Sequence, residues 1–547
     1  MRYIGPFFRM NSLSEKEING QLFYLSKEAV KSIVLNSRCG LVSQIKKYNK
    51  TSSSSDITTN SNFSPLLCVY RKASPTFIHS KNSNGFDEDS FKKEINPATN
   101  ALMSLCLLEL EDYYRKFKDI DNTIFSINTL YKSLSKDQLD FYSKNLRNRE
   151  GVFVDKKNVL ENNLKNFSLV DKDKKFKFSD QSFMMIAYYL YSIKNPDDDI
   201  SHSYKEFSLQ ILKMFCDFKD EIYNCSLDEI CKVILSLNIF YDYNNNSDAI
   251  DLIADLTDYI IGKFDEKDYY IDSLDTTCLF CIVLTLSYKH TKIMIFSEKS
   301  TEVINRLYTL YDEDKGSFYK LSSKKEIKYS CFDITFYILA FIVYQNNILF
   351  SNEYKILIST LYKKFIINSG LITSWPDAPT LDDYERYRGL SLKSADMVEE
   401  TYFRMPNIPS PTNTGIAPIF NKSINYNKRK DSFSNSKVTF DSYKNFFNFF
   451  LYIYLFKEEY MKELNLIESD TSITSNMPNS DNNDSNELNT DSISNTTKED
   501  ENSSTKPNSI SNNDNTSNNS PLIEDIEAIL LETKNNLNET DNSTDIL

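Results

Sequence analysis

Six short stretches of this chain are apolar on every side, and longer amphipathic segments separate them. The apolar stretches span residues 101–110, 183–191, 230–241, 278–286, 334–344 and 446–456. A helix that is apolar all round must be buried on every side. The segments between them carry apolar residues at steps of three and four, which is typical of helices with one buried face; they span residues 24–35, 124–146, 207–218, 250–261, 303–310 and 354–366. The order predicts six outer helices that alternate with six buried inner helices.

Glycines and capping residues mark where these helices would end and begin. Glycine readily adopts the left-handed conformation that terminates a helix. Five of the ten glycines follow an amphipathic segment and have an apolar or aromatic residue one or two positions later, and we expect them to end outer helices: Gly40, Gly151, Gly262, Gly316 and Gly370. Small or acidic residues before the inner helices predict N-caps; these are Asn96, Ser179 with Asp180, Ser226, Ser273 with Asp275, Ser330 with Asp333, and Asp441 with Ser442.

This repeat of outer helix, turn, polar loop and inner helix resembles the (α/α)6 toroid of six-hairpin glycosidases and of related polysaccharide lyases and sugar epimerases. The resemblance is architectural, covers roughly residues 20–460, and includes no motif that names one family. It implies an all-α fold, a toroid of alternating inner and outer helices, over residues 1–467. An open α-solenoid of paired helices is the structural alternative.

Two of the predicted loops are much longer than the others, and they belong to the first and last hairpins. They span about residues 42–96 and 371–440. These two loops become neighbours only if the ring of helices closes. They would then stand together over the N-termini of the inner helices, which is the face that holds the active site in the families resembled.

The second long loop contains the densest group of polar and aromatic residues in the chain. A glycosidase needs two carboxylates placed across a bond and an aromatic surface for a sugar ring. The candidate catalytic acids are Asp377, Asp382, Asp383 and Glu385. The candidate substrate-binding residues are Trp375, Tyr384, Arg386 and Arg388, together with Tyr70 and Arg71 in the first loop. The alternative interpretation is that these side chains cap loops, form surface ion pairs and anchor packing.

Four acids at the predicted starts of inner helices lie where a toroid also carries catalytic carboxylates. They are Asp180, Asp275, Asp333 and Asp441. Helix capping by itself explains acids at these positions, and this is the interpretation that we favour.

Composition excludes several other classes of protein. A net charge of -14 argues against nucleic-acid binding, which usually requires a clustered basic face. The longest apolar runs are about half as long as a bilayer-spanning helix, so no membrane partner is expected. Three histidines and one isolated CxxC, Cys278 with Cys281, predict no metal site and no cofactor. Nine cysteines within apolar segments, and an N-terminus without a signal-peptide pattern, predict a cytoplasmic protein with free thiols.

Residues 468–547 are rich in Asn, Ser and Asp, and their composition predicts a disordered tail. One segment of the tail, residues 521–537, has apolar residues at helical spacing. It predicts a short amphipathic helix that docks on a protein partner or on the barrel itself, unless the helix does not form.

Two functions remain open from the sequence. The first is a carbohydrate-active enzyme or sugar-binding protein that acts through a cleft under loops 42–96 and 371–440, and that resembles a glycoside hydrolase, lyase or epimerase if it is an enzyme. The second is a non-catalytic protein-interaction scaffold with a tethered C-terminal docking helix. The fold does not decide between them.

Overall fold

The computed structural model describes residues 14–43, 63–73, 77–79, 84–86, 91–159, 167–172, 175–320, 324–373, 376, 418–434, 439–464 and 466. The chain divides into two compact units, Met1–Ile467 and Glu468–Leu547. All of the described residues belong to the first unit. The tail and its expected helix at 521–537 lie outside them and remain predictions.

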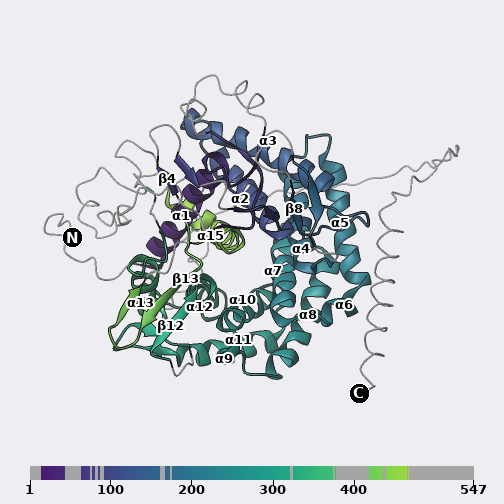
Figure 1. Ribbon diagram of the computed structural model, residues 1–547. Helices are drawn as coiled ribbons and strands as arrows, with labels where there is room; N and C mark the ends of the chain where they lie inside the picture. Colours follow the sequence, from purple (N-terminus) through teal and green to yellow (C-terminus); the bar gives the residue numbers. More distant parts are fainter. Residues whose placement is uncertain are drawn as a thin grey trace, which may run out of the picture. The chain divides into compact units, whose positions relative to one another are not determined.

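In the described part of the chain, six buried helices form an inner ring, as predicted (Figure 1). They are α2 (Pro97–Arg115), α4 (Phe178–Lys194), α7 (Leu227–Asn244), α10 (Leu274–Thr291), α12 (Cys331–Tyr344) and α15 (Ser442–Glu463). Each inner helix contacts the next in this order, and α15 contacts both α12 and α2. The ring of inner helices is therefore continuous.

Outer helices cover the inner ring. They are α1 (Glu15–Asn36), α3 (Asn122–Asn145), α5 (Ser201–Asp217), α8 (Ser247–Asp265), α11 (Met294–Tyr308), and α13 (Lys355–Leu361), which continues into the π-helical turn η4 (Tyr362–Ile367). The predicted outer helix at 303–310 begins and ends at later residues than α11 does. The first half of α11 is largely polar in sequence, so the burial of Phe296 and Ser300 was not predicted. Three short helical turns join the longer elements: α6 (Lys219–Tyr223), α9 (Tyr269–Asp272) and η3 (Gln345–Leu349).

The last inner helix packs on the first outer helix and thereby closes the ring. Helices α2, α4, α7 and α10 each pack on the outer helix that follows them in sequence, and α15 packs in the same way on α1. The rings of Phe23 and Tyr460 lie 4.5 Å apart across this contact. Asn19 Nδ2 donates a hydrogen bond to Glu459 Oε2 at 2.9 Å. The fold is an all-α (α/α)6 toroid of the six-hairpin glycosidase-like type, and the open solenoid is excluded.

Helix α12 shows why these apolar segments belong inside the ring. All 14 of its residues are buried. The continuous helical segment Cys331–Leu349 is long and apolar enough to cross a membrane by length and composition, but 78% of its most apolar window is buried against the rest of the protein. The burial is that expected of a core helix.

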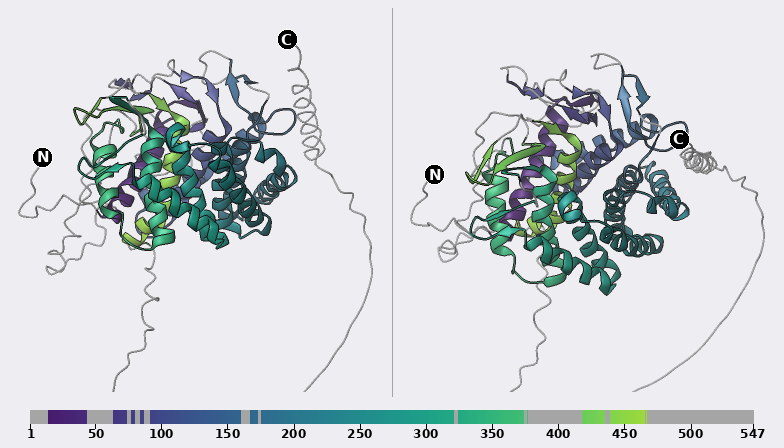
Figure 2. Two further views of the ribbon diagram at one scale, coloured as in Figure 1. Left: turned by 90° about the horizontal axis from the view of Figure 1, so that it is seen from below. Right: turned by 60° about the horizontal axis from the view of Figure 1, so that its bottom comes forward.

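Short strands gather at one end of the ring, where outer helices lead into inner helices (Figure 2). Three of the sheets have three strands: β12 (Glu326–Ser330) with β13 (Ser423–Asn427) and β14 (Ser432–Ser434); β15 (Phe440–Asp441) with β3 (Lys72–Ala73) and β6 (Phe91–Lys92); and β7 (Glu94–Ile95) with β8 (Lys156–Asn158) and β9 (Leu169–Asp171). Three are two-stranded: β1 (Gly40–Val42) with β2 (Leu66–Val69), β4 (Phe77–His79) with β5 (Asn84–Phe86), and β10 (Tyr311–Asp312) with β11 (Ser317–Phe318).

The pairing of β3 with β15 joins the first long loop to the last one. Lys72 lies opposite Asp441 in this antiparallel pair. The Ser442 amide and hydroxyl also donate to the Arg71 carbonyl oxygen, at 3.2 and 2.6 Å. Segments from opposite ends of the domain therefore meet over the start of α15, as expected for a closed ring.

The glycine stops were predicted correctly only in part. Gly151, Gly316 and Gly370 have positive φ angles, of 88°, 55° and 73°. Of these, Gly370 follows closely on the end of η4, whereas Gly316 forms the turn of the β10–β11 hairpin. Gly262 lies inside α8, which continues to Asp265.

Gly40 has a different role from the one predicted, because it lies in strand β1 and does not end α1. The left-handed residue after α1 is Arg38, with φ 54°. A Cβ at Gly40 would lie 1.8 Å from the carbonyl oxygen of Cys68 on strand β2. This close approach of two backbones requires glycine.

The predicted N-caps are mostly correct. Side chains of Asn96, Ser226, Ser330 and Asp441 accept a backbone amide at the start of their helices, and Ser330 with Asp333 forms a reciprocal capping box. Ser273 occupies an N-cap position without a capping hydrogen bond. The prediction at Ser179 and Asp180 is wrong, since α4 begins earlier, after Lys177.

Candidate functional site

Most residues that the sequence analysis proposed for the site lie outside the described part of the chain. These are the four candidate acids Asp377, Asp382, Asp383 and Glu385 and the four binding candidates Trp375, Tyr384, Arg386 and Arg388. Their roles remain predictions.

Tyr70 and Arg71 are described, and they differ in exposure. The Tyr70 side chain is buried, and its hydroxyl accepts a hydrogen bond from Asn158 Nδ2 at 3.1 Å. The Arg71 side chain is 42% exposed, and its Nη1 lies 3.7 Å from a carboxylate oxygen of Glu94 and 3.7 Å from one of Asp155. Of the two residues, only Arg71 is therefore exposed to solvent, and it lies near the carboxylates of Glu94 and Asp155.

At the same end, Asp180 in the first turn of α4 is buried and bridges two helices. Its Oδ1 accepts the Ala98 amide at 3.2 Å and Asn96 Nδ2 at 3.3 Å, so it satisfies the start of α2 rather than that of its own helix. Asn96 also donates to Asp155 Oδ1 at 2.8 Å. A network of polar side chains therefore connects the starts of α2 and α4.

The environment of Asp180 favours its protonated form. Burial raises the pKa of the Asp180 carboxyl to about 7, and the charges of Asp155 and Glu229 add to this, whereas Lys177 opposes it. A carboxyl group with such a pKa exchanges a proton readily near neutral pH, as a general acid or base requires. Among the described residues of this end, Asp180 is therefore a candidate for acid–base chemistry.

Helix α7 carries two further carboxylates, Asp228 and Glu229, in its first turn. Glu229 Oε1 accepts the Ser179 amide at 2.8 Å, which ties the start of α7 to the start of α4. Asp228 forms an ion pair with Lys232 one turn further along α7. Together Asp180, Glu229 and Asp228 place three carboxyl groups at the ends of two adjacent inner helices.

Lys232 reaches across the ring to the opposite inner helix. Its Nζ lies 5.5 Å from the centre of the Tyr443 ring on α15, and the two helices are separated by two others on either side. Burial opposes the charge of Lys232, but Tyr443 and the Asp228 carboxylate outweigh it and raise its pKa. We name Asp180, Asp228, Glu229, Lys232 and Tyr443 the mouth cluster.

Phenylalanines form a floor one turn below the mouth cluster. The Phe447 ring of α15 lies 5.7 Å from that of Phe183 on α4, and 5.4 and 5.5 Å from those of Phe332 and Phe336 on α12. Phe332 also contacts the Tyr443 ring at 6.2 Å. Aromatic side chains of α4, α12 and α15 therefore meet at this level, and Tyr443 of the mouth cluster packs against them.

Among the other acids at this end, Asp333 and Asp441 cap their helices, as the sequence analysis favoured. Asp333 also lies 2.6 Å from Lys320 Nζ. Burial raises the pKa of Asp333, although Lys320 opposes the shift. Asp275 accepts the Ser273 hydroxyl at 2.9 Å and the Thr276 amide at 3.0 Å. These contacts are those of a helix start.

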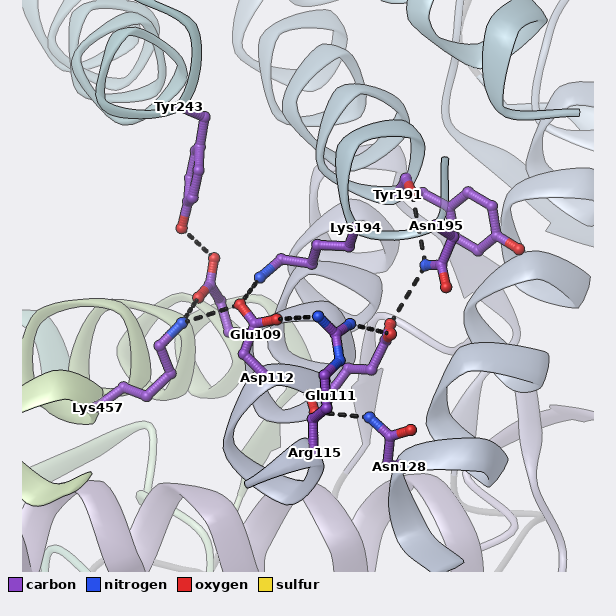
Figure 3. Close-up of polar contacts among 10 residues, drawn as sticks. All are labelled: Glu109, Glu111, Asp112, Arg115, Asn128, Tyr191, Lys194, Asn195, Tyr243 and Lys457. Carbon is purple, nitrogen blue, oxygen red and sulfur yellow. Dashed lines mark hydrogen bonds and ion pairs between the residues drawn. The ribbon is translucent and has the colours of Figure 1, made fainter. Parts of the chain in front are cut away.

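The opposite end of the ring carries a second polar network (Figure 3). Lys457 of α15 donates to Glu109 of α2, and Lys194 of α4 is paired with Asp112 of α2. Although burial favours the neutral acid, Lys457 and Lys194 lower the pKa of Glu109 to about 2. Burial lowers the pKa of Lys194 to about 8. Each carboxylate named here has a lysine ammonium group beside it. This network therefore links helices α2, α4 and α15 and does not provide a free acid or base.

A metal site is not formed by the described residues. No group of three or more His, Cys, Asp or Glu side chains within them is arranged to hold a metal ion. Cys278 and Cys281 of the CxxC are free, buried thiols, and burial raises the pKa of both.

Sequence reasoning missed Lys232, Glu229 and Tyr443, although one signal was present. Lys232 is the one charged residue in the first half of the apolar stretch 230–241. A charged residue in a helix otherwise buried all round needs a partner or a function. Tyr443 and Glu229 carry no such signal, because each stands among polar residues at the start of a helix.

Comparison with solved structures finds proteins of similar architecture. They include a D-mannose isomerase, which is 9% identical, with a TM-score of 0.42 over 67% of this chain and 88% of the other. A family 76 glycoside hydrolase (mannosidase) from Bacteroides thetaiotaomicron is 9% identical, with a TM-score of 0.41 over 83% and 100%. An endoglucanase from the termite Nasutitermes takasagoensis is 12% identical, with a TM-score of 0.42 over 81% and 99%. At these identities the similarities concern the fold and assign no activity to this chain. The sequence matches no protein-family model and no curated protein.

Proposed function

We propose that this protein is a carbohydrate-active enzyme that performs acid–base chemistry on a saccharide at the mouth cluster. The observation that carries this proposal is the buried Asp180 carboxyl, whose pKa is raised to about 7 beside the carboxyl group of Glu229. A pair of carboxyl groups at one site is what general acid–base reactions of sugars use.

The residues around Asp180 suit a polar ligand with an apolar face. Tyr443 is half-buried over the aromatic floor, and pyranose rings pack their C–H faces on such rings. Asp228 and Lys232 offer an acceptor and a donor for hydroxyl groups. In this proposal Asp180 donates its proton to the glycosidic oxygen as the C–O bond breaks, and Glu229 takes a proton from the water molecule whose oxygen forms the new bond to the same carbon.

The first experiment is a titration of the full-length protein with neutral and acidic oligosaccharides. The fluorescence of Trp375, the single tryptophan, reports binding. Saccharides that bind are then incubated with the protein, and the products are separated by chromatography. We expect one class of saccharide to bind saturably and to be converted.

A substitution identifies the acid. Asp180→Asn keeps the size and the accepting oxygen, and we expect it to reduce turnover by roughly 100-fold or more while binding is retained. Asp251→Asn, at an exposed position of outer helix α8, serves as the matched control. Full activity of Asp180→Asn would remove Asp180 from the mechanism, and no response to any saccharide would refute the proposal.

A second candidate function, a non-catalytic interaction scaffold, is favoured by the aromatic floor. Phe447 contacts Phe183 and Phe332 across the inner ring, and space filled by apolar side chains suits a scaffold better than a substrate channel. A scaffold would bind its partner equally well before and after the Asp180→Asn substitution at the mouth. Loss of partner binding in full-length Ile526→Asp, with the exposed Ile356→Asp as control, would assign the docking role to segment 521–537.

A further inference from the structure

Three lysines from separate segments surround the N-terminus of α15, next to the mouth cluster. Lys72 lies opposite Asp441 in the β3–β15 pair. The Lys422 amide donates to the Thr439 carbonyl oxygen at 3.2 Å, and its own carbonyl oxygen accepts the Cys331 amide at 3.0 Å. Lys444 stands in the first turn of α15. We name Lys72, Lys422 and Lys444 the lysine cluster.

Among the described residues, the lysine cluster has no carboxylate partners of the kind that other lysines of this protein have. Lys136, Lys299 and Lys364 form ion pairs with Asp198, Asp265 and Asp431 at 2.6, 2.9 and 2.6 Å. Within the described ranges, none of the three cluster lysines lies within ion-pair distance of a carboxylate.

The absence of partners has an electrostatic cost. Burial and the neighbouring Lys72 lower the pKa of Lys422, although Asp441 opposes the shift. The Asp441 carboxylate is itself engaged, since its Oδ1 accepts the Lys444 amide at 3.2 Å. Lys72 and Lys444 are close enough to Lys422 for their charges to repel it. Repulsion between them is relieved when an anion binds.

The lysine cluster is connected to the mouth cluster through aromatic side chains. Lys444 Nζ lies 4.6 Å from the centre of the Phe332 ring, and Phe332 contacts Tyr443 at 6.2 Å. Lys232 Nζ lies 5.5 Å from the Tyr443 ring, on the side of Asp180 and Glu229. An anionic group at the lysines would therefore place a neighbouring sugar ring along Tyr443 and toward the Asp180 carboxyl.

We infer that the substrate is an anionic saccharide, whose charged group binds Lys72, Lys422 and Lys444 while the reacting sugar lies at the mouth cluster. This inference rests on the proposed function and adds the class of substrate to it. The charged group is a carboxylate, a sulfate ester or a phosphate ester, since each accepts hydrogen bonds from several ammonium groups. The lysines position the substrate, and Asp180 acts on it.

The test compares four ligands on the full-length protein by calorimetry. They are tetragalacturonate, a chondroitin sulfate tetrasaccharide, mannose 6-phosphate and neutral cellotetraose. We expect one of the anionic ligands to bind at least about tenfold more tightly than cellotetraose, with an affinity that falls as NaCl is added. The ligand that binds identifies the charged group.

The variant for this test is Lys422→Met with Lys444→Met, and Lys213→Met on the exposed face of α5 is the control. We expect the double variant to lose about tenfold in affinity for the anionic ligand and to unfold at the same temperature as the wild type or above it, because repulsion is removed. A positioning role would further appear as a raised KM with a nearly unchanged kcat.

The outcomes separate the two proposals. Equal affinity for cellotetraose and the anionic ligands, or an unchanged affinity in the double variant, would overturn the anionic substrate and leave a carbohydrate-active enzyme standing. No binding of any saccharide would overturn both. Anionic binding that survives in Asp180→Asn, while turnover is lost, would support both.

Discussion

At the scale of single residues, neighbouring charges decide what the acids at the inner-helix ends do, because Asp333 and Asp180 are both buried. Asp333 and Asp180 both stand in the first turn of an inner helix, and the sequence does not distinguish them. Asp333 has Lys320 and a capping box. Asp180 is 3% exposed, accepts hydrogen bonds from the neighbouring helix α2, and has two further carboxyl groups near it. The two acids therefore have different surroundings, although they stand at equivalent positions in their helices.

The raised pKa of Asp180 predicts a specific dependence of stability on pH. The folded state holds this proton up to about pH 7, whereas the unfolded chain releases it near pH 4. The contribution of this carboxyl group to the free energy of unfolding is therefore full below about pH 4. It decreases as the pH rises and is lost once the pH has passed 7, a total change of up to about 4 kcal/mol. Denaturant unfolding from pH 4 to pH 8 should show this loss in the wild type relative to Asp180→Asn. A constant difference between the two proteins would contradict it.

At the scale of elements, the two glycines Gly40 and Gly262 show how one sequence pattern covers two structures. Both follow an amphipathic segment and have an apolar or aromatic residue one or two positions later. Gly40 is in a strand that touches the backbone of β2, and Gly262 is an exposed position within helix α8, with no atom within 4 Å of an added Cβ. The sequence pattern correctly predicts that a glycine lies near the end of an outer helix. Whether glycine is required at that position depends on the atoms that surround it in the folded protein.

Alanine at these two positions should have opposite effects on stability. Gly262→Ala should stabilise the protein by about 0.5–1 kcal/mol, because alanine loses less backbone entropy in a helix. Gly40→Ala should destabilise it by more than about 2 kcal/mol, because the carbonyl of Cys68 cannot move aside without disrupting β2. Thermal unfolding of both variants measures the difference. Equal shifts in Tm would show that the β1–β2 contact is not tight.

At the scale of the whole domain, closure of the ring makes its first and last helices interdependent. Tyr460 of α15 is 1% exposed and packs on Phe23 of α1 at 4.5 Å and on Tyr113 of α2 at 6.0 Å. In an open array of repeats, the terminal helices would unfold separately from each other. In a closed ring, each of them needs the other.

Tyr460→Ala should therefore weaken both ends of the domain together. We expect a loss of about 3–5 kcal/mol in the free energy of unfolding, as for other buried aromatic side chains. Hydrogen exchange should accelerate in α1 and α15 alike, whereas the 80% exposed Phe350→Ala control should change neither. Faster exchange in α15 alone would mean that the ring does not depend on this contact.

The sequence determined the helices, their order and which of them are buried. Apolar stretches such as 334–344 have no polar face, so burial inside a ring follows from hydrophobicity alone, and capping residues such as Ser330 act through their immediate neighbours. The tertiary structure decided which acids share a site, because the environment of Asp180 is made by Asn96, Ala98 and Glu229, which lie far from it in the chain. The tertiary structure also decided that Lys72, Lys422 and Lys444 lie close together. They belong to segments that are distant in the sequence, and closure of the ring brings these segments to the start of α15.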